Sequence, residues 1–451
     1  MSVAAARPVP PLYRTLWRWH FYAGLFVLPF VLVLALSGTV FLFKPQIERW
    51  EERDFRQLAA AGAVSPSQQV EAALAALPGA TFHSYRLPES PRDAALVHLA
   101  LSDGAMRDVF VAPDGRVLGS LDAGRRITEI ARRIHGQLLL GQGGSWLVEL
   151  VACWAIVMII SGLYLWWPRG RGAAGVVWPR RGSLLRDLHA VTGFWVSTFA
   201  MVLLLTGLPW TDVWGNAFNK VRAQAGWVKG APQWNIGNAP APAQAAHANH
   251  DHGGMHAGHG GSTSLAILDD LVERGAREQL AYPALVLAPG AALFGPPSAN
   301  WTLTSATQNR PLGKTLTFAA DSGEQLTRET FAERHPIDRV IGYGLAWHEG
   351  ALLGVLNQVI GVLTALALAT LSVTGFLIWR RRRPAGALGA PPLPSDRRRP
   401  AFVAAVIVLL ALLLPLLAAS LVVLLLLDAL LPRVSPRAAA WLGITRAARA
   451  A

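Results

Sequence analysis

Five long apolar stretches constrain the fold of this chain more than any other feature of its sequence. Each is long enough to cross a hydrocarbon core of about 30 Å as a helix that rises about 1.5 Å per residue. The first has 23 residues without a charge, longer than the apolar part of a cleaved signal peptide, so we predict a helix that stays. The sequence therefore predicts an α-helical integral membrane protein. The predicted spans are Phe21–Phe43, Ser145–Trp167, Ala190–Val213, Ala351–Trp379 and Ala401–Leu427.

Composition agrees with this class and argues against another. Of the 451 residues, 52% are hydrophobic and only 15% are charged, a balance that departs from soluble domains toward membrane proteins. The net charge of +13 could indicate nucleic-acid binding, but the arginines lie beside apolar runs and form no stripe on a soluble domain. We therefore expect membrane lipid, and no nucleic acid, as a partner. The single cysteine, Cys153, lies in an apolar run and is expected to pack there.

Arginine-rich segments beside the spans predict the orientation. Short loops on the cytoplasmic side of a membrane are enriched in Lys and Arg, and such clusters precede the first span and follow the second and fourth. We predict a bacterial inner-membrane protein with a cytoplasmic amino terminus and two large periplasmic segments. The tail after the fifth span also falls in the periplasm, where its arginines fit the rule poorly. The predicted order is 1–43, 44–144 (periplasmic), 145–213, 214–350 (periplasmic), 351–379, 380–400 (cytoplasmic, Arg-rich), 401–427 and the tail 428–451.

Each periplasmic segment has the pattern of a small α+β module, with a helix, short alternating strands and a glycine turn. In the first module the helix is Pro66–Leu77, the strands are Phe82–Leu87, Leu96–Leu101 and Arg107–Val111, and the turn is Pro113–Gly115. In the second the helix is Leu265–Val272, the strands are Ala284–Ala288, Trp301–Thr304 and Lys314–Phe318, and the turn is Asp321–Gly323.

A histidine-rich stretch lies in an Ala/Gly/Pro-rich linker of the second periplasmic segment, at 247–259. Imidazole suits Zn, Cu, Ni and Fe, so one interpretation is a flexible chelator of a periplasmic transition metal. The other is an unselected low-complexity linker, because composition alone gives no geometry. The candidate ligands are His247, His250, His252, His256 and His259.

The spans contain an internal repeat. The first and third share His-x3-Gly-x12-[Ser/Thr]-Gly, and the second and fourth share His-x5-Gly-x19-[Ser/Thr]-Gly-x3-Trp. The chain is therefore predicted as two helix-hairpin halves related by a pseudo-twofold axis along the membrane normal, with a fifth helix outside the repeat. We interpret the small residues of the [Ser/Thr]-Gly pairs as helix-packing contacts. The matched positions are His20, Ser37 and Gly38 with His189, Thr206 and Gly207, and His135, Ser161 and Gly162 with His348, Thr374 and Gly375.

Depth sorts the four repeated histidines into two predicted pairs. His20 and His189 start their spans on the cytoplasmic side. His135 and His348 each lie 31 residues before the tryptophan that ends the next span, which places them at or beyond the outer boundary. Two imidazoles from facing helices can fill both axial positions of a haem iron, giving an electron-transfer centre. The alternative is interfacial histidines bound to carbonyls or headgroups, and a mononuclear zinc site is weaker because a third ligand is not assured.

Several arginines lie close to the outer histidines in the sequence. Arginine pairs well with carboxylates such as a haem propionate. It also anchors membrane helices at headgroups, because its long side chain reaches the interface. Both roles stay open for Arg126, Arg132, Arg133 and Arg339.

The chain resembles the PepSY-associated transmembrane family, which includes periplasm-facing ferric-siderophore reductases. The resemblance rests on Trp17–Leu25, Arg186–His189, Trp347–Gly350, Thr374–Arg380 and a closing hairpin at Val109–Gly119. It implies PepSY-like periplasmic modules and two haem b groups, one on His20 and His189 and one on His135 and His348. It also implies that electrons reach a ferric chelate outside the inner membrane and release Fe(II).

Two functions follow as hypotheses. The first is a di-haem oxidoreductase that reduces a periplasmic ferric siderophore or other metal complex. No G-x-G-x-x-G fingerprint opens a βα unit, so its electron donor must be quinol or another protein. The second is a non-redox importer or metal chaperone that uses the histidine-rich linker for capture.

Overall fold

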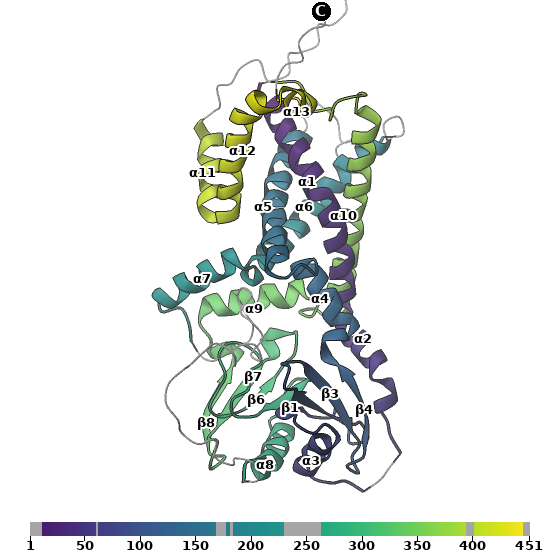
Figure 1. The fold of residues 1–451 in the computed structure, drawn as a ribbon, viewed down its shortest axis with the longest axis vertical. Helices are drawn as coiled ribbons and strands as arrows, with labels where there is room; N and C mark the ends of the chain where they lie inside the picture. Colours follow the sequence, from purple (N-terminus) through teal and green to yellow (C-terminus); the bar gives the residue numbers. More distant parts are fainter. Residues whose placement is uncertain are drawn as a thin grey trace, which may run out of the picture. The chain divides into compact units, whose positions relative to one another are not determined.

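The computed structural model describes residues 11–59, 62–167, 177–180, 184–229, 263–393 and 401–444 (Figure 1). The chain divides into two compact units. The helical unit contains residues 1–39, 134–217 and 359–451, and the sheet unit contains residues 40–133 and 218–358. The histidine-rich stretch at 247–259 lies outside the described residues, so its proposed chelation stays a prediction.

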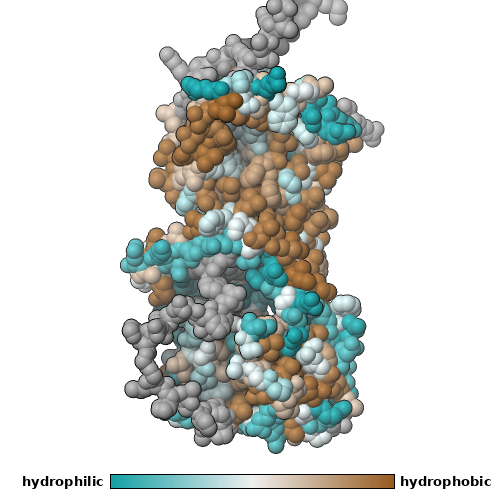
Figure 2. All heavy atoms as spheres, in the orientation of Figure 1, coloured by the Kyte–Doolittle hydropathy of each residue, from teal (hydrophilic) through white to brown (hydrophobic). Residues whose placement is uncertain are grey.

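Within the described residues, five helices are long and apolar enough to cross a membrane, which confirms the predicted class. Large hydrophobic side chains such as Leu36, Leu205 and Leu366 remain exposed on them, and hydrophobic residues cover most of the face of the helical unit that Figure 2 shows. Such a surface suits lipid and not water. The five are α1 (Pro11–Leu42), α5 (Gly141–Trp166), α6 (Leu184–Gly207, extended by a 3₁₀ turn to Trp210), α10 (Val355–Arg382) and α12 (Pro415–Val434).

A buried acid in the second span, Glu149, binds the start of a later helix. Glu149 on α5 is fully buried, and its carboxylate accepts hydrogen bonds from the backbone N–H groups of Val213 and Trp214 at 2.9 and 3.0 Å. These residues begin α7 (Val213–Gln224), whose first N–H groups have no partner within the helix. Glu149 therefore fixes the direction in which the chain leaves α6.

The prediction of a single fifth spanning helix over 401–427 is wrong. The helix breaks at Leu414, and the two pieces, α11 (Ala401–Leu413) and α12, run side by side in opposite directions (Figure 1). Pro415 causes the break, because proline has no N–H to continue a helix but suits the first turn of a new one. The turn packs near Leu208 and Trp214.

The chain then returns to the end of the helical unit where α1 begins. Helix α13 (Pro436–Leu442) follows α12, and the carbonyls of Leu442 and Gly443 accept hydrogen bonds from Tyr22 and Arg18 at 2.5 and 3.0 Å. The described part of the tail therefore lies at the same end as the start of α1, not at the opposite end as predicted. This end is called the His20 end below.

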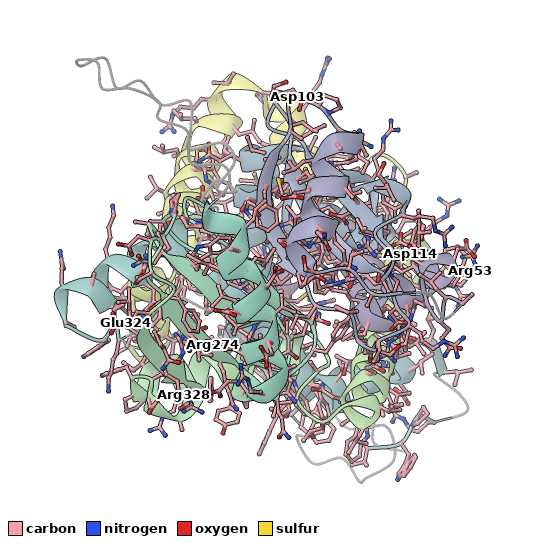
Figure 3. The ribbon with its side chains drawn as sticks, turned by 90° about the horizontal axis from the view of Figure 1, so that it is seen from below. Arg53, Asp103, Asp114, Arg274, Glu324 and Arg328 are labelled. Carbon is pink, nitrogen blue, oxygen red and sulfur yellow. The ribbon has the colours of Figure 1, made fainter. Side chains whose placement is uncertain are left out.

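The sheet unit contains one antiparallel sheet of eight strands in the order β4-β3-β2-β1-β5-β6-β7-β8. Helices α3 (Pro66–Ala76) and α8 (Thr263–Arg277) cover one face, where Val97, Val286, Leu303 and Phe318 form the core. Charged side chains such as Arg53, Asp103 and Arg328 project from the surface of this unit (Figure 3). The strands are β1 (Thr81–Arg86), β2 (Ala95–Ala100), β3 (Met106–Val111), β4 (Val117–Asp122), β5 (Ala284–Leu287), β6 (Trp301–Ser305), β7 (Lys314–Phe318) and β8 (Gln325–Thr330).

The two predicted modules are halves of this single sheet. Strands β1 and β5 pair at Ser84–Leu287, Tyr85–Val286 and Arg86–Leu285. Pairing removes the exposed edge that each four-stranded half would otherwise have there. Each half keeps the predicted order of a helix and a strand meander. The remaining helices of the unit are α2 (Lys44–Glu51), most of α4 (Ile127–Gln137) and α9 (Pro336–His348).

Candidate functional site

The imidazole of His20 lies against α5. Its Nδ1 is 3.1 Å from the carbonyl oxygen of Met158 and 3.1 Å from the hydroxyl of Ser161. Gly162 faces the ring so closely that a Cβ there would stand 3.0 Å from Cε1 of His20. The ring is therefore held by a carbonyl, a hydroxyl and a residue without a side chain.

The imidazole of His189 has the same surroundings in the second half. Its Nδ1 is 3.0 Å from the hydroxyl of Thr374 on α10, and the ring also lies near the backbone carbonyl of Leu371. A Cβ on Gly375 would stand 3.3 Å from Cε1 of the ring.

The imidazole of His135, near the end of α4, meets a third copy of this arrangement on α1. Its Nδ1 is 2.9 Å from the carbonyl oxygen of Leu34 and 3.3 Å from the hydroxyl of Ser37. A Cβ on Gly38 would stand 2.9 Å from Cε1 of the ring. We call each such carbonyl, hydroxyl and glycine an imidazole socket.

The sockets change the interpretation of the [Ser/Thr]-Gly pairs. The sequence pattern favoured helix packing as their role, but the atoms nearest to Gly38, Gly162 and Gly375 are imidazole atoms. In each socket the carbonyl comes from the residue three positions before the hydroxyl, which places the two on the same helix face. The pairs therefore support histidines from another helix.

Each socket also selects a protonation state of its ring. A carbonyl can only accept, so Nδ1 carries the proton and Nε2 keeps its lone pair, the form of imidazole that binds a metal. Among the described residues, none hydrogen-bonds Nε2 of His20 or His189. Burial lowers the pKa of His135, which also favours the neutral ring.

His20 and His189 both lie in the helical unit, and a charge on His189 would act on His20. Their pairing on one haem stays a prediction. His135 binds at Gly38, 18 residues further along α1 and so roughly 27 Å from the level of His20. His348 is the last residue of α9 in the sheet unit, and its pairing with His135 stays a prediction.

These residues fit haem better than a bare metal ion. The described residues contain no group of three His, Cys, Asp or Glu side chains that could hold a metal ion. Paired imidazoles with protonated Nδ1 are instead suited to the two axial positions of a haem iron. His20 and His189 would hold one such group, and the glycine sockets set their ring positions.

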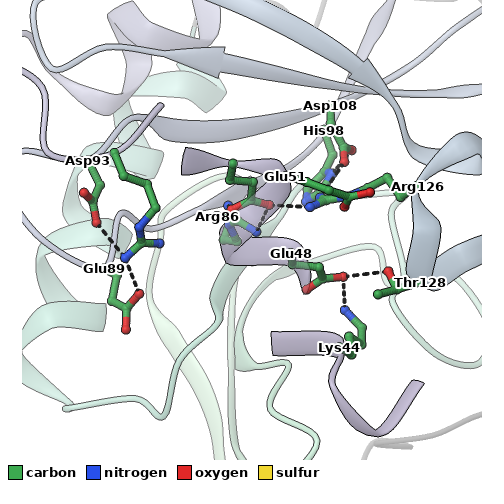
Figure 4. A network of polar contacts seen from close by, with 12 residues as sticks. Lys44, Glu48, Glu51, Arg86, Glu89, Asp93, His98, Asp108, Arg126 and Thr128 are labelled. Carbon is green, nitrogen blue, oxygen red and sulfur yellow. Dashed lines mark hydrogen bonds and ion pairs between the residues drawn. The ribbon is translucent and has the colours of Figure 1, made fainter. Parts of the chain in front are cut away.

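Arg126 already has three carboxylate partners. Its guanidinium contacts Glu51, Glu52 and Asp108 at 3.1, 2.7 and 3.2 Å, and Figure 4 shows these contacts. The surrounding carboxylates raise the pKa of Arg126 and keep it charged. A role with a haem propionate would require this buried cluster to open.

The other predicted arginines are exposed. Arg132 pairs with Glu129 one turn earlier on α4, and Arg133 and Arg339 lie on open surface. Sequence analysis missed three buried arginines of the second half, Arg222, Arg310 and Arg334. No local pattern separates them from the other arginines of the chain, because the carboxylate partners of Arg222 and Arg310, Asp338 and Glu349, are distant in sequence.

A family model described as the PepSY-associated TM region matches residues 17–382. The chain belongs to this family. The match contains the four repeated histidines and all three sockets, and it ends before the α11–α12 hairpin. A search of curated proteins finds no match to this PepSY-associated chain.

Proposed function

We propose that this PepSY-associated protein is a di-haem oxidoreductase of the bacterial inner membrane. It would pass electrons across the membrane to a periplasmic ferric siderophore or another metal complex and release Fe(II) for uptake. The observation that supports this proposal is the imidazole socket, which occurs three times with a carbonyl, a hydroxyl and a glycine around the ring. A histidine that merely met headgroups would not need a glycine beneath its ring.

His20 and His189, which both lie in sockets, would hold one haem. His135, also in a socket, would hold the second haem together with His348. A haem held by these residues would supply one-electron transfer. Each electron delivered converts one Fe(III) of the chelate to Fe(II). The sockets hold protons on Nδ1, and the apolar helices exclude water from the rings.

The direct test is the haem content of the purified full chain. The wild type should bind about two haems, and His20→Ala or His189→Ala should reduce this to about one by pyridine haemochrome. His135→Ala and His348→Ala should remove the other. His83→Ala, which changes a histidine of the sheet unit outside the repeat, is the matched control and should keep two. A colourless wild-type protein would refute the proposal and favour a carrier.

The socket itself can be tested on one helix. Gly162→Val should displace the His20 imidazole and lower haem content, because its side chain would overlap the ring. Gly143→Val changes a glycine of the same helix that has no atom within 4 Å of a built Cβ, and should leave haem content unchanged. Equal haem content in both variants would show that the sockets do not serve haem. Deleting residues 247–259 should alter metal capture alone.

A further inference from the structure

The second half of the sheet unit contains a buried arginine with an open hydrogen-bonding edge. Arg334 is only 6% exposed, yet its Nε and Nη2 form no hydrogen bond. The nearest carboxylate oxygen, on Glu329, is 3.7 Å from Nη2, which is too far for a hydrogen bond. Burial lowers the pKa of Arg334, so nearby groups compensate its charge poorly.

Nearby carboxylates balance the charge of Arg334 only in part, because Glu329 stands 3.7 Å from Nη2 and Asp338 is shared with another arginine. Asp338 on α9 is bound by Arg222 of α7, and it acts electrostatically on Arg334 as well as on Arg222. Arg222 is 5% exposed and its Nε also has no partner. Two buried guanidinium groups thus share one carboxylate. Buried charges in proteins are normally paired and fully hydrogen-bonded, because an unpaired one costs several kcal/mol.

The two open nitrogens of Arg334 define the shape of the missing partner. Nε–H and Nη2–H lie along one edge of the guanidinium plane and point in parallel. This fork matches the two oxygens of a carboxylate, which it binds with two charge-assisted hydrogen bonds. A single-point acceptor such as a hydroxyl or a carbonyl would satisfy only one of them.

We propose that Arg334, with Arg222 beside it, binds a carboxylate group of a ligand. The ligand is either a carboxylate-bearing metal chelate that docks on the sheet unit or a haem whose propionate reaches Arg334. Only the second source rests on the proposed function. In the second case Arg334 takes the propionate-binding role that the sequence suggested for Arg126 and its neighbours.

The first experiment uses the purified full chain and citrate, with and without Fe(III), in a calorimetric titration. Arg334→Gln and Arg334→Lys should both weaken binding about tenfold or more, because lysine keeps the charge but loses the fork. Arg328→Gln is the matched control, since Arg328 is exposed on β8 and pairs with Glu278. Glu329→Gln should bind citrate as well as the wild type does. Weakening by the lysine variant supports the chelate as the source.

The second experiment compares haem with its dimethyl ester, in which both propionates are blocked. If a propionate is the partner, the wild type should take up haem more tightly than the ester, and Arg334→Gln should remove this preference while citrate titration shows no change. If neither citrate binding nor this preference depends on Arg334, the carboxylate site is refuted. A chain that binds no haem at all refutes the proposed function, and the citrate titration then decides this inference alone.

Discussion

The two halves of the sheet unit share one architecture but treat buried charge differently. In the first half, Arg126 satisfies three carboxylates, and a second arginine, Arg86, binds Glu52 at 2.6 Å. In the second half, Asp338 meets two arginines, and buried N–H groups of both lack partners. The charged groups of the first cluster thus find their partners within the chain, whereas N–H groups of both arginines in the second cluster do not. Repetition of a fold therefore does not determine which buried charges each half contains or how they are neutralised.

The sign of the charges is exchanged between the halves. The helix that follows the first span, α2, supplies acids toward the start of α4, where Glu51 also accepts a hydrogen bond from the N–H of Ile127. The helix that follows the third span, α7, supplies Arg222 toward an acid on α9. An acid beside a helix start is favourable because the N–H groups there are unpaired. Both halves gain this contribution, the first from Glu51 and the second from Asp338 in the first turn of α9.

The largest loss of stability is expected for Arg126→Gln. Removing this guanidinium leaves Glu51, Glu52 and Asp108 buried without their shared partner, which should cost about 3–5 kcal/mol. Thermal unfolding of the purified chain, followed by hydrogen exchange in β3, measures the loss. Arg125→Gln is the neighbouring control, because Arg125 has 87% of its side chain exposed and should change stability by less than about 0.5 kcal/mol. Similar losses in both variants would show that the cluster does not stabilise this half.

A smaller effect is expected for Asp338→Asn. The amide keeps one acceptor for Arg222 and removes a carboxylate whose pKa is raised by burial, so the variant resembles the protonated acid and should change stability by about 1 kcal/mol or less. Hydrogen exchange in α9 should therefore change far less than exchange in β3 does in Arg126→Gln. A larger loss of stability in Asp338→Asn than in Arg126→Gln would contradict this difference between the halves.

Acidification should lower the stability of the first half and raise the stability of the second. Arginine and histidine partners lower the pKa of Glu52 and Asp108, although burial opposes them. Their stabilisation is present above their ordinary pKa values of 4.5 and 3.8 and is lost as the pH falls through the lowered values. Burial raises the pKa of Asp338 and Glu349, so their ionisation opposes folding, and this cost is relieved as the pH falls through the raised values.

Hydrogen exchange, corrected for the intrinsic rate at each pH, tests these signs. Between neutral pH and about pH 5, opening of α9 should require more free energy, and opening of β3 should be unchanged. Parallel changes in α9 and β3 would contradict the assigned directions.

The smallest effect is expected for Arg334→Gln without added ligand. This variant loses no hydrogen bond of the two open nitrogens and removes a poorly compensated charge, so its stability should stay within about 0.5 kcal/mol of the wild type. Unfolding in the absence of carboxylates provides the measurement. A loss as large as that of Arg126→Gln would mean that Arg334 already has a partner within the chain.

Sequence patterns predicted most of the elements, because each depends on local order. Hydropathy located the spans, and alternation located strands such as Lys314–Phe318 at their observed bounds. Spacing alone also found the [Ser/Thr]-Gly pairs. It could not show that they face His20, His135 and His189, because periodicity identifies the face of a helix and not the group opposite it.

Two features were beyond such patterns for different reasons. The run from Ala401 to Leu427 is apolar throughout, so hydropathy could not detect the reversal at Leu414, although Pro415 was the available signal. The clusters around Arg126 and Arg334 join residues that are far apart in the chain, such as Arg222 and Asp338, which are separated by 116 positions. The pairing of β1 with β5 has the same cause.

The α11–α12 hairpin brings the tail back to the end of the helical unit where the described chain starts. Arg18 and Tyr22 contact the carbonyls at the end of α13, so Arg437 lies at the same end of this unit as Arg14. A cytoplasmic position of this end would satisfy the positive-inside rule for Arg433 and Arg437 as well. Because the family match ends at residue 382, the hairpin adds a pair of apolar helices beyond the segment that the family model describes.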